Sequence, residues 1–292
     1  KMIELGVDVC YNADETAVFF EYLPTKTVDT KGSRTVWVKC GGKEKERATA
    51  MLLGDSKGNK YSPTVIFKTQ KSKLAEVAKF NTAHQHGFGK TVWKEIKTLQ
   101  KSTGMEIYGN AAAWWNSDMS IQFLKLHFGA REDVSRPILL LLDDFSGHWT
   151  EEVKAYARSI KVHLLKVPPS ATSACQPADV AWMRPLKVRL RRYWVEFLRK
   201  QIEDNTCEYA FKMTAPTKSI IAEWIYNGWN ELSGETIMSG YRRARQLQSE
   251  EQKRLDIDTM SVIRSLESLN LLDSSVGVLD PENEFDGGGV DS

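Results

Sequence analysis

The sequence has no long apolar run and very little cysteine. No stretch approaches the roughly 20 apolar residues of a transmembrane helix, and no charged-then-apolar signal segment opens the chain. The four cysteines among 292 residues include no C-x-x-C pair, which favours reduced thiols in an intracellular protein over a disulfide framework or a zinc site. Because 41% of the residues are hydrophobic and 10% aromatic, we expect a soluble, folded protein without a membrane partner.

Charge is unevenly distributed along the chain, although the formal net charge is only +2. Residues 246–292 contain three basic and eleven acidic residues, a net charge of −8, which leaves +10 on residues 1–245. The acidic segment ends in DPENEFDGGGVDS. We therefore predict a mostly disordered tail over 249–292, with one weak helix near 258–271. The preceding domain, residues 1–248, is positive, which favours a polyanionic partner.

The first two thirds of the chain alternate strand-like and turn-like segments with Gly and Asn turns, a pattern that predicts a meander of antiparallel strands. A segment with helical spacing and a polar start, residues 116–128, follows this meander. The strand-like runs are VCYNADETAVFFEYL, TVWVKC, RATAMLLGD, SKGNKYSP and TVIFK.

The second half of the chain alternates helix and strand patterns. Leu139–Leu142 form a continuous apolar run, which is typical of a strand buried on both faces. TEEVKAYARS then predicts a helix capped by Thr150, and KVHLLKVPP predicts a short strand stopped by prolines. A long helix over 179–204 should start late or kink at Pro185, and two more helices are expected near 217–231 and 234–246. The order predicts an α/β fold, a mixed sheet flanked by helices.

Two adjacent carboxylates, Asp143 and Asp144, end the leucine strand. Ligands of open α/β sheets bind at strand ends, so acids in this position suit a functional site. A plainer interpretation is that one of them only caps the following turn, because Asp is favoured where backbone donors need partners. The stretch alone leaves both interpretations open.

Two further acids occupy positions that require a reason. Asp14 lies inside a strand-like run, and Asp179 lies between an irregular loop and a helix, where backbone donors favour an anion. Three carboxylates brought together would repel one another and raise their pKa values. A divalent cation such as Mg²⁺ removes that cost, and paired ions can promote the hydrolysis of a phosphodiester.

The chain resembles a known family, the DDE superfamily endonucleases of the pogo-like branch of mariner-type transposases, a group that also gave rise to centromere protein B. The resemblance runs from about residue 7 to residue 246, and the second and third acids have 35 residues between them. It rests on four motifs in order, NADET, LLLLDDFSGHWTEEV, VPPSATSACQPADVAWMRPLK and ETIMSGYRRA.

The resemblance implies an RNase H-like fold with Asp14, Asp143 and Asp179 as catalytic residues and metal ligands. Asp144 is then only the neighbour of Asp143. The implied cofactor is a pair of Mg²⁺ ions, for which Mn²⁺ substitutes, and the implied substrate is DNA, not a small molecule. Such transposases cut DNA by attack of water and transfer the freed strand. They usually act as dimers, and a nuclear location is expected.

The front of the chain departs from the family pattern. Full-length relatives carry helix-turn-helix segments before the catalytic domain, whereas this chain begins 13 residues before Asp14. The sequence is then either a fragment or the product of a gene that lost the module. A different class of function also stays open, namely a domesticated descendant that binds DNA or chromatin without cutting it.

Basic residues cluster directly after Asp179, with Trp182, Tyr193 and Trp194 between them. They predict contacts with DNA phosphates, while the alternative is an amphipathic helix with a solvated basic face and its aromatic residues in the core. The strongest candidates are Arg184, Lys187, Arg191 and Arg192, and the cluster also includes Arg189, Arg199 and Lys200.

Three other candidates receive secondary roles. His148 would orient water, touch a phosphate or stabilise its loop. The pair His84 and His86 has metal-like spacing but lacks further ligands, so a surface loop is the better interpretation. Glu15 should point to the strand face opposite Asp14, which argues against a ligand role.

Overall fold

A six-stranded sheet organises the part of the chain that the computed structural model describes, residues 1–22, 41–43, 45–168, 171–204 and 213–244. The predicted strand over 35–40 and the predicted acidic tail lie outside the described residues, so the boundary at residue 248 stays a prediction. The strands are β1 Cys10–Phe19, β2 Arg47–Asp55, β3 Lys60–Lys68, β4 Glu106–Asn110, β5 Ile138–Leu142 and β6 Val162–Lys166.

The strands follow the order β4-β3-β2-β1-β5-β6. β1, β2 and β3 form the expected antiparallel meander. β5 runs parallel to β1, β6 runs parallel to β5, and β4 adds in parallel to β3. The leucine strand β5 lies inside the sheet, and all four of its leucines are buried. The predicted α/β class, a mixed sheet flanked by helices, is confirmed.

Helical segments connect and cover the strands. None of the described helices combines the length and apolarity needed to cross a lipid bilayer. The α-helices are α1 Met2–Leu5, α2 Ala75–His84, α3 Lys90–Thr103, α4 Ser117–Leu124, α5 Glu151–Ser159, α6 Thr172–Cys175, α7 Met183–Glu203, α8 Lys218–Asn230 and α9 Gly234–Arg243. Tighter or wider turns are η1 Lys125–Gly129, η2 Ser146–His148 and η3 Ala178–Trp182.

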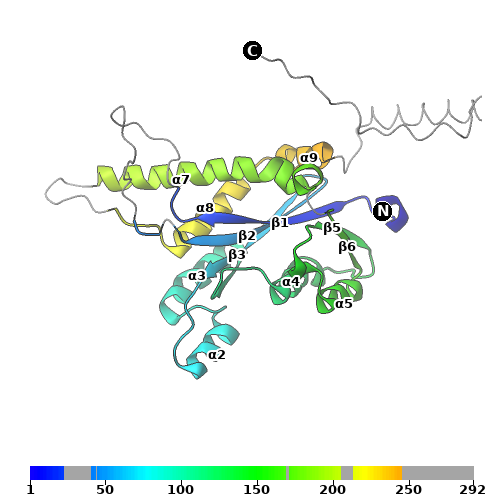
Figure 1. The fold of residues 1–292 in the computed structure, drawn as a ribbon. Coiled ribbons are helices and arrows are strands. Elements are labelled where there is room, and N and C mark those ends of the chain that lie inside the picture. Colours follow the sequence, from blue (N-terminus) through cyan, green and yellow to red (C-terminus); the bar gives the residue numbers. More distant parts are fainter. Residues whose placement is uncertain (23–40, 44, 169–170, 205–212, 245–292) are drawn as a thin grey trace, which may run out of the picture. The chain divides into compact units, whose positions relative to one another are not determined.

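Side chains on the two faces of the sheet enter two separate hydrophobic clusters. Leu52 packs into the cluster that includes Leu186, Ile225 and Ile237 of α7, α8 and α9. Its neighbour Leu53 packs into the cluster that contains α4 and α5. Figure 1 shows α7 and α9 on one side of the sheet and α4 and α5 on the other. Alternation along the strands thus produces a three-layer arrangement.

The predicted cap at Thr150 is confirmed, and two further helices carry caps of the same kind. The Thr150 hydroxyl accepts a hydrogen bond from the Val153 backbone N–H at 3.4 Å, at the start of α5. Thr217 and Ser233 do the same for α8 and α9. These side chains satisfy N–H groups that a helix leaves without partners, and the three predicted helices are confirmed.

The sequence interpretation missed α2, α3 and β4. In α3 only Ile96 is fully buried, and β4 has five residues whose strand character depends on its pairing with β3. Local pattern therefore carries a weak signal for β4. For α3 a signal was present, because Trp93, Ile96 and Leu99 recur at helical spacing.

Two prolines have the local effects that their chemistry dictates. Pro63 lies within β3, a strand that joins two segments predicted separately. The pairing of β3 with β2 shifts register between Met51 and Leu53, because proline has no N–H to donate. Pro185 falls in the first turn of α7, after the wide turn η3. The predicted late start of this helix is confirmed.

Helix α9 packs against the segment that leads to Asp179. The Trp182 indole N–H donates to the Ile237 carbonyl oxygen at 3.2 Å. A Cβ at Gly240 would lie 2.6 Å from the Pro177 carbonyl oxygen and 2.7 Å from Trp182 Nε1. Only glycine permits this approach, because real Cβ contacts are longer.

Gly240→Ala should therefore destabilise the protein by about 1–3 kcal/mol, since either α9 or η3 must move. Denaturant unfolding monitored by tryptophan fluorescence measures the change. The matched control is Ser239→Ala in the same helix, whose hydroxyl donates to the Thr236 carbonyl oxygen. It should change stability by less than about 0.5 kcal/mol, and equal effects of the two variants would contradict the packing argument.

Candidate active site

Asp14 and Asp143 lie at the same level of two neighbouring strands. In the parallel pairing of β1 with β5, Asn12 is opposite Leu141, and each aspartate comes two residues after its member of that pair. Neighbouring strands are about 4.8 Å apart. β5 ends at Leu142, so Asp143 is the first residue beyond it. Strand register thus brings the main chains of the first two predicted acids together.

The side chain of Asn12 also binds the segment that carries the third predicted acid, Asp179. Asn12 is fully buried, and its Nδ2 donates to the Leu141 carbonyl oxygen at 3.2 Å. Its Oδ1 accepts from the Ala178 backbone N–H at 2.9 Å, and Ala178 directly precedes Asp179. One amide therefore joins the three segments that carry the predicted catalytic acids.

The charges of these acids act on one another. Asp14 is buried and Asp179 is exposed. Burial raises the pKa of the Asp14 carboxyl well above its usual value, and the negative charges of Asp179, Glu15 and Asp143 raise it further. The Glu15 backbone N–H, which donates to Asp14 Oδ1 at 3.0 Å, acts in the opposite direction. Among the ion pairs of the described residues, none joins these four acids to a lysine or arginine.

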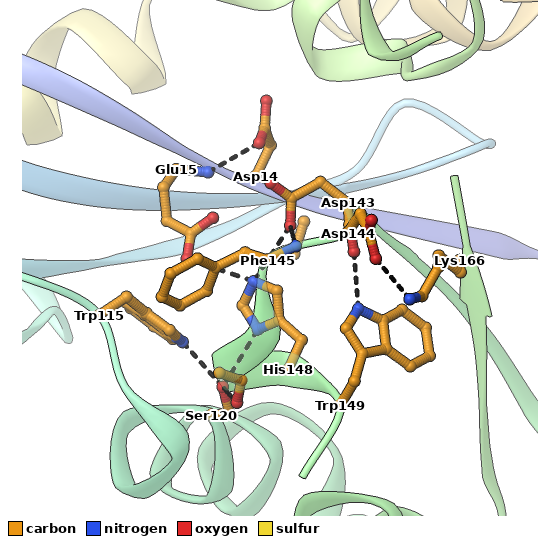
Figure 2. Close-up of polar contacts among 12 residues, drawn as sticks. Asp14, Glu15, Trp115, Ser120, Asp143, Asp144, Phe145, His148, Trp149 and Lys166 are labelled. Atoms are coloured by element: carbon orange, nitrogen blue, oxygen red, sulfur yellow. Dashed lines mark hydrogen bonds and ion pairs between the residues drawn. The ribbon is translucent and has the colours of Figure 1, made fainter. Parts of the chain in front are cut away.

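Glu15, Asp143 and His148 form a compact group on the other side of β1. Figure 2 shows Asp14 and Glu15 leaving the strand in opposite directions, while the Asp143 carboxylate turns toward Glu15. His148 Nε2 lies 3.2 Å from Glu15 Oε1 and 3.5 Å from Asp143 Oδ1. The three potential ligand atoms lie within 4.8 Å of one another. Glu15 faces away from Asp14, as expected. The same direction places its carboxylate near Asp143 and His148, so it does not argue against a ligand role.

His148 is held by a buried hydrogen-bond network. Ser120 Oγ accepts from the Trp115 indole N–H at 2.9 Å and donates to the Gly147 carbonyl oxygen at 2.9 Å. His148 Nδ1 lies 3.1 Å from the same hydroxyl, and which of the two atoms donates depends on the tautomer of the ring. When Nδ1 carries the proton of a neutral imidazole, Nε2 is an acceptor that faces two carboxylates.

The donor set fits a divalent cation. Within the described part of the chain, Glu15 Oε1 and His148 Nε2 are buried atoms without a hydrogen-bond partner. Acceptor atoms that face one another without a proton repel, and a cation removes that repulsion. Carboxylate oxygens are the ligands that Mg²⁺ and Mn²⁺ prefer. Among the described residues, the potential ligands that lie together are Glu15, Asp143 and His148, whereas the Asp14 side chain leaves β1 on the opposite side.

Asp144 has a different environment from Asp143. Its carboxylate forms an ion pair with Lys166, whose ammonium group lies 4.9 Å above the Trp149 ring. The Trp149 indole N–H donates to the Asp143 carbonyl oxygen at 2.8 Å. Asp144 is thus engaged with β6, and Asp143 is the member of the pair that faces the acidic group.

A groove runs from Asp179 along α7. The exposed side chains of Arg184, Lys187 and Arg191 recur on one helix face and line the groove, opposite Phe19 and Tyr22.

Arg192, the fourth predicted DNA contact, does not line this groove. Its Nη2 donates to both carboxylate oxygens of Glu231, at 2.9 and 2.8 Å, because the next position along a helix points about 100° away. Trp182 and Trp194 are core residues, as the alternative interpretation held.

His84 and His86 do not converge on one point. His84 Nδ1 lies 3.3 Å from the Phe80 carbonyl oxygen, at the exposed end of α2. His86 Nδ1 lies 3.0 Å from the Ile107 carbonyl oxygen, and its ring stacks on Tyr108. Each ring therefore has its own local contacts.

Sequence reasoning missed Asn12 and Ser120. A polar residue two positions before an aspartate in a strand-like run was the available signal for Asn12, since it shares the face of Asp14. Ser120 carried no comparable signal, because its partners come from other elements.

Residues 45–241 match the family described as DDE superfamily endonuclease. This range is more than half of the chain, and the chain belongs to that family. Asp143 and Asp179 lie within the matched range, and Asp14 precedes it.

The chain is also similar to two curated proteins whose names refer to the pogo transposable element. The chain is 27% identical over 235 residues to "Pogo transposable element with KRAB domain" of Homo sapiens, and equally to the protein of that name from Mus musculus. The matches cover 80% of this chain and 34% of each relative, so the chain spans about a third of their length. Among solved structures, a Mos1 mariner paired end complex with Mn matches with a TM-score of 0.48 at 9% identity, over 81% of this chain and 52% of that one.

Asp14→Asn should raise the melting temperature of the metal-free protein at neutral pH, by about 2–4 °C for each kcal/mol of relieved repulsion. The folded-state pKa of Asp14 is raised, so its unfavourable effect is absent at low pH and grows as pH rises from the usual aspartate range toward the raised pKa. Thermal unfolding of wild type and variant in EDTA across pH measures the difference.

The control for this prediction is Asp118→Asn, an exposed aspartate in the first turn of α4 where negative charge is favourable. It should not raise the melting temperature. Addition of Mn²⁺ should stabilise wild type more than Asp14→Asn, and equal stabilisation would contradict a ligand role for Asp14.

Asn12→Ala should destabilise the protein by about 2–4 kcal/mol, because the Leu141 carbonyl oxygen and the Ala178 N–H both lose a buried partner. It should also weaken Mn²⁺ binding, measured by isothermal titration calorimetry under conditions where the variant is folded. Unchanged Mn²⁺ affinity would show that the amide does not position the acids.

Proposed function

We propose that this chain is the catalytic part of a pogo-like DDE transposase, which cuts DNA phosphodiester bonds and transfers the freed strand. The observation that carries the proposal is the buried Asn12 amide, which joins the segments of Asp14, Asp143 and Asp179. Family membership supports an endonuclease, and the similarity to pogo-derived relatives supports this branch.

In the proposal, Asp14, Asp143 and Asp179 hold two Mg²⁺ ions, for which Mn²⁺ substitutes. Such ions, when bound, make water a stronger nucleophile and neutralise charge on the leaving oxygen. The uncompensated charge around the buried Asp14 carboxyl supports a cation at this place. His148 lies against both Glu15 and Asp143 and orients the Asp143 carboxylate.

Arg184, Lys187 and Arg191 bind phosphates of the DNA strand that lies in the α7 groove. Because they share the groove with Asp179, a strand held there passes the acids. Cleavage forms a bond between the water oxygen and phosphorus and releases a 3′ hydroxyl. The oxygen of that hydroxyl then bonds to the phosphorus of a target phosphodiester, whose own P–O bond breaks and releases a 3′ hydroxyl of the target strand. Phosphate binding of this kind weakens steeply with salt.

Assembly and location belong to the same proposal. A transposase joins two DNA ends, which fits a homodimer, and its chromosomal substrate fits a nuclear location. Recognition of transposon ends would require segments comparable to those of the longer relatives. The competing function is a domesticated protein that binds DNA or chromatin without cutting it.

Nicking of supercoiled plasmid distinguishes the two functions. We expect the wild-type chain to nick plasmid only with Mg²⁺ or Mn²⁺, and Asp143→Ala to lower the nicking rate by at least about 10²-fold, since the loss of one preorganised charge at a reaction centre has this magnitude. Gel analysis of plasmid topology over time gives the rate.

The matched control is the adjacent Asp144→Asn, which removes a carboxylate that pairs with Lys166 and should retain activity within a few fold. Equal losses in the two variants would contradict the assignment of Asp143. Plasmid binding without any metal-dependent nicking would favour the domesticated function.

A further inference from the structure

A second hollow opens on the Glu15 side of β1. It has a volume of about 280 Å³, and its walls include Asp14, Asp143, Arg47, Trp114 and Phe145. Ala17 lines both this hollow and the α7 groove. The two depressions therefore adjoin at β1, and aspartates line both of them, Asp179 the groove and Asp14 and Asp143 the hollow.

Trp114 is unusual because a large aromatic side chain is 61% exposed on a tightly held loop. The loop between β4 and α4 is organised by Asn110, whose Oδ1 accepts from the Trp114 backbone N–H at 3.3 Å. Its Nδ2 donates to the Trp114 carbonyl oxygen at 2.8 Å. Both backbone polar groups of Trp114 are thereby bound to one side chain.

The neighbours of Trp114 hold the loop in a strained conformation. Ala113 has a φ of 55°, which residues with a Cβ rarely adopt. Its carbonyl oxygen accepts from the Thr49 hydroxyl at 2.7 Å, and its side chain is buried. On the other side, Trp115 is buried beside His148. Hydrogen bonds and packing thus fix the conformation of this loop, and the loop holds the Trp114 ring exposed at the surface.

Arg47 adds an available cation to the same hollow. It is exposed at the start of β2, and it makes no ion pair with any residue that the structure describes. An aromatic face beside a free guanidinium is the combination with which proteins hold single-stranded nucleic acid, since every base stacks and every linkage carries a phosphate.

We infer that this hollow binds an unpaired nucleobase next to the cleaved phosphodiester, with the base stacked on Trp114 and its phosphate near Arg47. The inference rests on the proposed nuclease function. Its volume is close to the lower end of small-ligand sites, about 300 Å³, so it admits one base but not a duplex. Because its walls include Asp14 and Asp143, the bound nucleotide flanks the bond that these acids act on.

The test uses two labelled DNA probes of the same arbitrary sequence, a blunt 30-base-pair duplex and one with a three-nucleotide overhang. Binding is measured by fluorescence anisotropy in Ca²⁺ at fixed salt. The wild-type chain should prefer the overhang. Trp114→Ala should weaken overhang binding by about 5- to 150-fold, the range that stacking of one base supplies, and leave blunt binding within about twofold. Trp114→Phe should restore most of the preference.

Two controls separate stacking from general effects. Phe80→Ala removes an aromatic ring that is 51% exposed on α2 and should change neither affinity. A 2-aminopurine placed in the overhang should lose fluorescence on binding wild type and Trp114→Phe, but not Trp114→Ala, because only a stacked base is quenched.

Equal binding of the two probes by wild type, or an unchanged overhang preference in Trp114→Ala, would overturn the inference. A Trp114→Ala variant altered only in its sedimentation would also overturn it and assign the ring to contact with a second copy. The plasmid assay reports separately on the nuclease: metal-dependent nicking by wild type together with an unchanged overhang preference in Trp114→Ala defeats this inference alone, and absence of nicking defeats the proposed function.

Discussion

The arrangement of the site depends on one buried amide. A buried amide is costly unless both of its ends find partners, and Asn12 meets this requirement with Leu141 on β5 and Ala178 at the start of η3. The strand register and the position of η3 are therefore coupled through one side chain. Because an aspartate follows each of these three residues within two positions, the constraint that completes the core also assembles the acids.

Repulsion among the acids lowers the stability of the folded protein, and packing elsewhere in the fold offsets it. Asp14 is buried among carboxylates that raise its pKa, whereas hydrophobic clusters on both faces of the sheet hold the surrounding strands in place. Close packing of Gly240 against Pro177 stabilises the segment before Asp179 from the other side. Such a preorganised but strained charge cluster is what a metal-dependent site requires of its scaffold.

Alternation along β1 gives the site two sides. Asp14 and Glu15 leave the strand in opposite directions, and the α7 groove and the Trp114 hollow share Ala17 in their linings. One side offers cations for a phosphate backbone, and the other offers an aromatic ring and a single cation. This difference in chemistry is the basis for assigning the DNA backbone to the α7 groove and an unpaired base to the Trp114 hollow.

The sequence by itself determined many of the local elements and predicted the acids. The leucine strand, the capping residue Thr150 and the late start of α7 follow from periodicity and backbone chemistry. Short elements such as β4 did not, because they exist through pairing. Tertiary structure alone decided that Glu15 reaches Asp143, that Arg192 turns to Glu231, and that Asn12 meets partners 129 and 166 positions away. Contacts over such separations depend on register and packing, which no local pattern encodes.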